Sequence, residues 1–77
     1  PGYEGPIFVQ GCPEGAVVKF MDITGALVYE TRSSGGTARW NGTNLSGQAA
    51  ASGVYLVYIT DALGAVTAQG KVLLIRQ

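Results

Sequence analysis

The chain has 77 residues, and its five basic and five acidic side chains leave no net charge. This neutrality gives no electrostatic reason to expect binding to nucleic acid or to an anionic membrane surface. Apolar residues make up 47% of the chain and charged residues 13%, a composition that favours a folded domain over a disordered chain, yet no apolar run approaches the roughly 20 residues that span a bilayer. We therefore expect one small domain over residues 1–77, and a piece of a longer protein because the chain starts at Pro1 rather than Met.

Short β-rich runs separated by turn residues fill the first half of the chain. Residues 7–9 form the first expected strand, and Pro13 and Gly15 belong to the turn that follows it. Residues 16–21 and Leu27–Arg32 flank another turn, so together they predict a β-hairpin.

The second half contains the clearest strand pattern. Thr37–Trp40 is a short expected strand, and Asn41-Gly42 after it is a strong tight-turn dipeptide because both residues tolerate positive φ. Residues 54–60 are apolar on both faces, as expected of a central strand. Residues 65–75 form the last strand, or two strands that are broken at Gly70.

The fold class follows from the spacing of these elements. No window keeps a helical period, and turn signals recur about every 8–12 residues, which is typical of a β-sandwich. The sequence therefore predicts an all-β fold: a small immunoglobulin-like antiparallel β-sandwich of about six to seven strands. The residues expected to form its core are Ile7, Val9, Val18, Phe20, Val28, Trp40, Leu45, Tyr55, Val57, Ile59, Val72 and Leu74.

The chain is poor in residues that carry chemistry. It has no histidine, so Cys12 lacks the base that a cysteine nucleophile needs, and a zinc site lacks ligands. We interpret Cys12 as a small, half-buried residue beside a turn. Asp22 and Asp61 fit turn positions that accept backbone N–H groups better than a paired acid and base. We therefore expect no enzyme activity, no catalytic or metal-binding residues and no cofactor.

The last segment, residues 71–76, is apolar on both faces. A small sandwich buries only one face of an edge strand, so Leu73 and Ile75 should form an exposed apolar strip. This pattern predicts a docking surface. The alternative is that the strand is central and covered within the domain.

The tyrosines allow a second binding hypothesis. Phe20, Trp40 and Tyr55 fit the core, and Tyr3, Tyr29 and Tyr58 are expected to face the opposite way. Three exposed tyrosines would form a stacking surface for a sugar or a partner protein. The alternative is that they form cross-strand pairs that stiffen a sheet.

Four motifs in chain order resemble one known family. Residues 16–29 resemble the A-x-V-x-I-x-D-x-x-G-x-x-V strand pair of the C-terminal sorting domains of the type IX secretion system. Trp40-Asn41-Gly42, Gly53-Val54-Tyr55 and the closing residues 71–76, a K-x-x-x-x-K/R pattern, resemble the same family. The variant with Trp-Asn-Gly looks most like the C-terminal domain of PorZ-like proteins, which carry two β-propellers ahead of it.

This resemblance implies a sorting and docking domain that directs its parent protein through an outer-membrane translocon of a Bacteroidetes-type bacterium. The parent would cross the periplasm and reach the outer-membrane surface or the exterior. The expected partners are translocon or sortase components and an anionic lipopolysaccharide, with no nucleic acid, and self-association through the last strand is a further option. The residues expected to act in sorting and docking are Gly53, Val54, Tyr55, Lys71, Val72, Leu73, Leu74, Ile75 and Arg76.

Two alternatives to sorting remain open. One is a retained module that binds a glycan, lipopolysaccharide or protein through Tyr3, Tyr29 and Tyr58. The other is a structural spacer. The Trp-Asn-Gly element also recurs in the immunoglobulin-like half of flagellar hook-capping proteins, so the fold alone does not decide between these functions.

Overall fold

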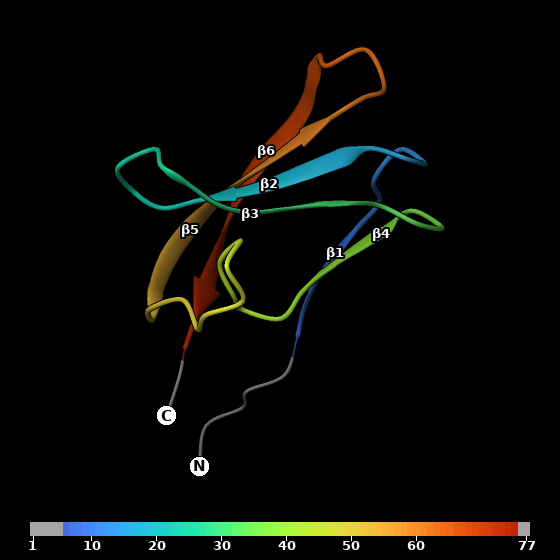
Figure 1. Ribbon diagram of the computed structural model, residues 1–77. Coiled ribbons are helices and arrows are strands. Elements are labelled where there is room, and N and C mark those ends of the chain that lie inside the picture. Colours follow the sequence, from blue (N-terminus) through green and yellow to red (C-terminus); the bar gives the residue numbers. More distant parts are fainter. Residues whose placement is uncertain (1–5, 76–77) are drawn as a thin grey trace.

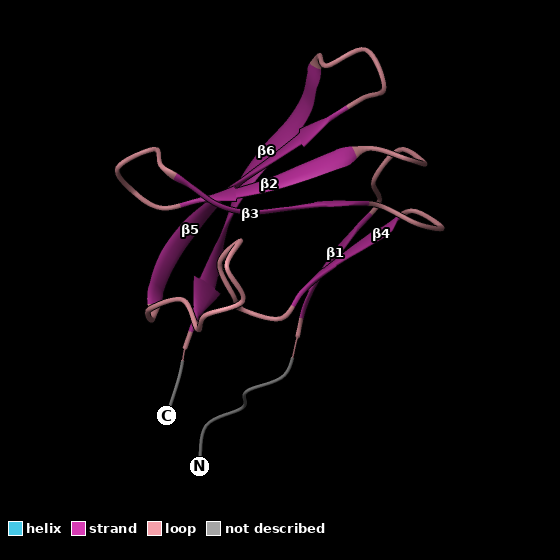
Figure 2. Ribbon diagram, viewed as in Figure 1, coloured by secondary structure: helices cyan, strands magenta, loops and turns pink. Residues whose placement is uncertain are grey.

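The protein is described by a computed structural model that covers residues 6–75. It contains two antiparallel sheets, one of two strands in the order β1-β4 and one of four strands in the order β3-β2-β5-β6 (Figure 1). Figure 2 shows only strands and loops in this part of the chain. The strands are β1 (Ile7–Gln10), β2 (Val17–Met21), β3 (Leu27–Arg32), β4 (Thr37–Trp40), β5 (Gly53–Thr60) and β6 (Val66–Leu74). The predicted all-β antiparallel sandwich is confirmed.

Two hairpins of the larger sheet close through the same five-residue turn. Asp22 begins the β2–β3 turn and Asp61 begins the β5–β6 turn. In each turn the aspartate Oδ1 accepts the backbone N–H groups two and four residues later, at 2.9 and 3.0 Å. Gly25 and Gly64 then take positive φ, 90° and 87°, which a side chain would disfavour. The predicted hairpin and the turn role of both aspartates are therefore confirmed.

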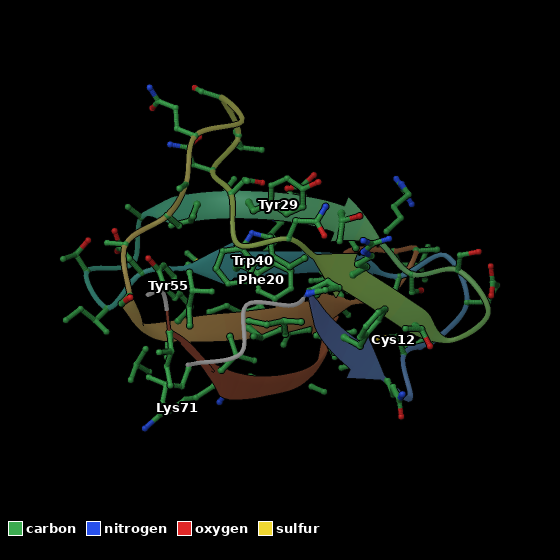
Figure 3. All side chains as sticks on the ribbon, turned by 90° about the horizontal axis from the view of Figure 1, so that it is seen from below. Cys12, Phe20, Tyr29, Trp40, Tyr55 and Lys71 are labelled. Carbon is green, nitrogen blue, oxygen red and sulfur yellow. The ribbon has the colours of Figure 1, made fainter. Side chains whose placement is uncertain are left out.

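The core lies between the two sheets and is built around Trp40. The Trp40 ring stacks on Phe20, with ring centroids 4.6 Å apart, and meets the edge of Tyr55 at 5.1 Å. Figure 3 shows these three rings gathered between the sheets. The buried residues are Cys12, Ala16, Val18, Phe20, Ala38, Trp40, Ala50, Tyr55, Val57, Ile59 and Leu74, and Ile7, Val9, Val28, Tyr29 and Val72 pack against them.

Leu45 is the one expected core residue that the structure places in solvent, at 62% exposed. The Asn44 side chain explains this, because its Oδ1 accepts the backbone N–H groups of Ser46 and Gln48. These bonds close a local turn whose backbone groups are satisfied without the core. Leu45 lies within that turn, and its side chain is left largely in solvent.

The predicted tight turn at Asn41-Gly42 is only partly correct. Gly42 has positive φ (75°), but Asn41 does not, so the dipeptide does not form the expected two-residue turn. The chain instead enters a loop that an isolated bridge between Thr43 and Ala49 closes. The Trp40 indole N–H donates to the Thr43 carbonyl at 2.7 Å, so the loop is fastened to the core ring.

Two smaller expectations are also resolved. Cys12 is buried rather than half-buried, at 7% exposed, and its backbone N–H donates to the Gly36 carbonyl at 2.9 Å. The last segment is one continuous strand through Gly70, not two. No helix that would be long and apolar enough to cross a membrane occurs in residues 6–75.

Candidate functional site

The two segments singled out from the sequence are neighbours in the structure. β6 lies at the edge of the four-stranded sheet and pairs with β5. In this antiparallel register Gly53 lies opposite Leu74, Val54 opposite Leu73, and Tyr55 opposite Val72. The Gly-Val-Tyr motif and the closing strand therefore form one two-stranded edge.

Strand alternation divides the predicted residues between the two faces of this edge. Tyr55, Val72 and Leu74 point inward and belong to the core or pack against it. Tyr55 also donates its hydroxyl hydrogen to the Ala51 carbonyl, which holds the ring in place. These residues build the domain, and their side chains are not available to a partner.

The outward residues form an exposed apolar surface. Leu73 is 60% exposed, Ile75 53% and Val54 42%. We call these three residues the outer strip. The exposure expected for Leu73 and Ile75 is confirmed, and the alternative of a central, covered strand is excluded because β6 is an edge strand.

The outer surface continues beyond the residues that the sequence indicated. On the neighbouring strands, Met21 lies opposite both Leu56 and Leu27, and Leu27 is 43% exposed. Leu56 is two residues after Val54 in the same strand, so strand alternation alone places it on the same outer face. Met21 joins it because β2 pairs with β5, which local sequence does not reveal, and Leu27 follows through its pairing with Met21 in the β2–β3 hairpin.

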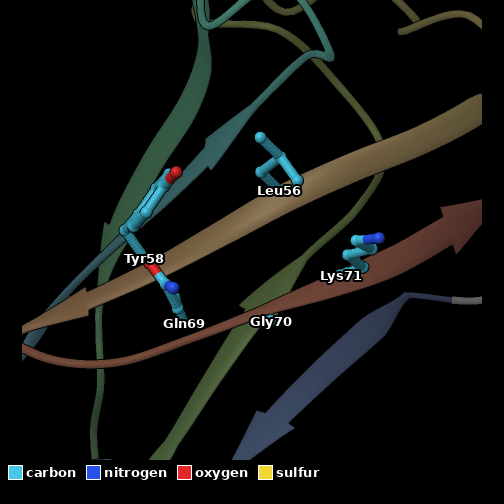
Figure 4. A pocket seen from close by; sticks show the side chains of 5 residues that line it. All are labelled: Leu56, Tyr58, Gln69, Gly70 and Lys71. Carbon is cyan, nitrogen blue, oxygen red and sulfur yellow. The ribbon is translucent and has the colours of Figure 1, made fainter.

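Polar groups border this apolar area. Lys19 lies opposite Glu30 on one side and Tyr58 on the other. Beyond Tyr58, a shallow hollow of about 290 Å³ is present (Figure 4). It is lined by Leu56, Tyr58, Gln69, Gly70 and Lys71.

The three tyrosines do not form one face. Tyr29 lies opposite the buried Phe20 and packs against the core, so its expected outward orientation is wrong. The physical reason is a register shift between Phe20 and Met21, which places one additional residue in β3 and changes which side chains face inward. Tyr58 does face outward, opposite Lys19. Tyr3 and Arg76 lie outside the described residues.

The Asp22 carboxylate has a local structural role. Hydrogen bonds lower the pKa of Asp22 below its usual 3.8, first from the Thr24 hydroxyl and then from the Ala26 backbone N–H. Both bonds belong to the β2–β3 turn. Within residues 6–75, no three His, Cys, Asp or Glu side chains are grouped so that they would hold a metal ion.

Comparisons with known proteins add one relative. No protein-family model matches the chain, and no curated protein does. Among solved structures, the fold is similar to part of PorZ, described as an essential bacterial surface component of the type IX secretion system of Porphyromonas gingivalis. The match has 33% sequence identity and a TM-score of 0.76, and it covers 95% of this chain. The chain spans only 10% of the length of PorZ, so what is shared is a domain of a type IX secretion component.

Proposed function

We propose that this domain is a non-catalytic sorting and docking domain. It directs export of its parent protein through the type IX secretion system, across the periplasm to the outer-membrane surface or the exterior. The single observation that carries the proposal is the outer strip, Val54, Leu73 and Ile75, on an edge hairpin of a domain that is similar to part of PorZ.

The outer strip has the physical properties of a docking surface. Burying one large apolar side chain completely contributes about 1.5–3 kcal/mol, so three half-exposed side chains together supply several kcal/mol on docking. The β6 edge next to the strip also offers unpaired backbone groups to a partner strand. Side-chain burial and main-chain pairing would thus both contribute to the free energy of binding.

The experiment is an export assay with a reporter protein fused ahead of this chain, in a bacterium that has the secretion system. The test variant carries Leu73→Ser together with Ile75→Ser. The matched control is Leu63→Ser, because Leu63 is 93% exposed but lies in the β5–β6 turn. We expect the double variant to leave the reporter in the periplasm and the control to reach the surface.

Substitution is preferable to deletion here. Removing residues 71–77 would also remove Leu74 from the core and unpair Gly53 to Leu56 of β5. Circular dichroism and a urea titration of each variant confirm that the fold is retained. Normal surface export of a folded Leu73→Ser, Ile75→Ser variant would contradict the proposal.

A second candidate function is favoured by the hollow at Tyr58, Gln69 and Lys71. An aromatic face, an amide and an ammonium group are the groups that bind an anionic sugar by stacking, hydrogen bonding and charge. Titration with the purified anionic polysaccharide tests it. Shifts in the Tyr58 and Gln69 NMR signals that disappear in Lys71→Ala would support this function, and an unchanged spectrum would exclude it.

A further inference from the structure

One sheet of the sandwich has two strands and the other has four. This difference leaves a second hollow on the inner face of the larger sheet. β4 packs near β3, and β1 lies toward β5 and β6. Between β1 and β6 a hollow of about 210 Å³ remains. Its lining is Phe8, Val9, Val57, Ile59, Ala68, Gln69, Gly70, Lys71 and Val72. The two-stranded sheet thus ends before it covers the inner face of β6.

The edge of β1 beside this hollow is unpaired within residues 6–75. In an antiparallel strand, successive residues direct their backbone N–H and C=O groups to alternate sides. About half of the residues in Ile7–Gln10 therefore present these groups to the open edge. Such an edge requires either water or another backbone to satisfy it.

β1 also lacks the devices that protect natural edge strands from pairing, which are charges, prolines and bulges. Its sequence, Ile-Phe-Val-Gln, contains none of them, and Phe8 is 54% exposed. The other sheet differs: its edge strand β3 carries Glu30 and Arg32, and β6 carries Lys71 and a register shift. The other edge of the two-stranded sheet, β4, carries Arg39, so among the described edges only β1 has neither a charged residue nor a bulge.

Gly70 provides an independent observation on the opposite wall. It lies in the middle of β6, on the inner face opposite Val57. Its φ is outside the left-handed region, and a Cβ added there would meet no atom within 4 Å. Neither conformation nor packing requires glycine at this position, although glycine weakens a strand by about 0.5–1 kcal/mol. Interior strand glycines often mark a place where another backbone or a ligand approaches closely.

We propose that the hollow between β1 and β6 is a binding slot for one extended peptide strand from another protein. The strand pairs with the open edge of β1 and places an apolar side chain over Gly70. A peptide is the occupant that fits, because only another backbone matches the alternating donors and acceptors of β1.

The lining also defines the composition of the strand. It is apolar on the β5 side, so alternate residues of the strand are apolar. Gln69 and Lys71 border the slot without directing their side chains into it, because those side chains lie on the outer face with Tyr58 and Leu56. The inner lining therefore presents no charged side chain to the strand, and an uncharged strand is favoured.

A second copy of the chain that pairs through β1 is the competing occupant, and the formation of a dimer by the free chain would distinguish it from a peptide strand. The slot accepts a single strand, and it is separate from the outer strip.

The probe is a synthetic peptide, acetyl-Thr-Val-Thr-Leu-Thr-Val-Thr-amide, titrated into the ¹⁵N-labelled chain to millimolar concentration. We expect amide shifts and slowed hydrogen exchange at Ile7–Gln10 and shifts at Ala68 and Gly70. Gly70→Leu fills the hollow without removing any core side chain, so it should weaken binding at least about tenfold while the free energy of unfolding is unchanged or higher. Gly70→Ala, which leaves most of the hollow open, is the matched control.

Three further outcomes decide the interpretation. A peptide with the same side chains and N-methylated backbone should not bind, because it cannot pair with β1. Leu73→Ser with Ile75→Ser should bind normally, which separates this slot from the export function. Absence of shifts at β1, unchanged binding by Gly70→Leu, or a dimer of the free chain that protects the β1 amides in sedimentation and exchange experiments would overturn the proposal.

Discussion

Trp40 is the residue on which both sheets depend. It belongs to the two-stranded sheet, is fully buried, and contacts Phe20 and Tyr55 of the four-stranded sheet. Its indole N–H also holds the following loop through the Thr43 carbonyl. One side chain therefore supplies apolar packing between the sheets and an anchor for the loop.

Replacing Trp40 should be the most destabilising single change in the core. Trp40→Ala removes the largest buried side chain and should cost about 3–5 kcal/mol, a large part of the stability of a small domain. Trp40→Phe keeps a ring but leaves the Thr43 carbonyl without its donor, so about 1–3 kcal/mol is expected. Urea denaturation measures both values. A Trp40→Ala loss no larger than that of Trp40→Phe would contradict this role.

Asp22 should make stability depend on acid pH. Because hydrogen bonds in the native turn lower its pKa below 3.8, the ionised form is favoured by folding. This contribution is fully present above pH 3.8 and is lost as the pH falls through the lower native value. The difference in unfolding free energy between the natural chain and Asp22→Asn should therefore shrink over that interval. Urea titrations of both proteins at each pH measure it, and a difference that stays constant would contradict the assignment.

At the scale of the element, β6 is a strand with two different faces. Leu74 is 7% exposed and packs in the core, while the adjacent Leu73 is 60% exposed. Leu74→Ala should cost about 2–3 kcal/mol, and Leu73→Ala should change stability by less than about 0.5 kcal/mol. Urea denaturation again provides the measurement. Equal losses would mean that β6 does not keep the alternation on which the outer strip depends.

Local pattern predicted most strands because alternation is itself a local property. Leu27–Arg32 and Thr37–Trp40 were predicted with their observed bounds, and the last strand differs by one residue at each end. Tyr29 was misplaced because nothing in the sequence of β3 marks the register shift opposite Phe20. Leu45 was misplaced because the hydrogen bonds of Asn44 outweigh its hydrophobicity.

The candidate site was predictable to the extent that it lies on one strand. Leu73 and Ile75 follow from the two-faced pattern of the closing segment. Met21 completes the surface through the pairing of β2 with β5, which are far apart in the chain, and Leu27 follows through its pairing with Met21. The hollow between β1 and β6 depends on the unequal sizes of the sheets. No single segment contains that information.

At the scale of the molecule, the two sheets share one core and should unfold together. The buried cluster draws residues from β2, β4, β5 and β6, and Cys12 joins it from the connection between β1 and β2. Small domains with one core usually unfold in a single cooperative step. The buried Cys12 thiol is a natural probe of that step, because it is the only cysteine in the chain.

We expect a thiol reagent to label Cys12 slowly in the native protein and rapidly in urea, because 7% exposure leaves little access to the sulfur. If access requires global opening, a substitution in a different strand must accelerate labelling by its effect on stability. Leu74→Ala should then raise the native labelling rate about tenfold for each 1.4 kcal/mol that it removes, and Leu73→Ala should leave it unchanged. If Leu74→Ala does not change the labelling rate, Cys12 is labelled through local opening of the β1–β2 connection. The two sheets would then not form one cooperative unit.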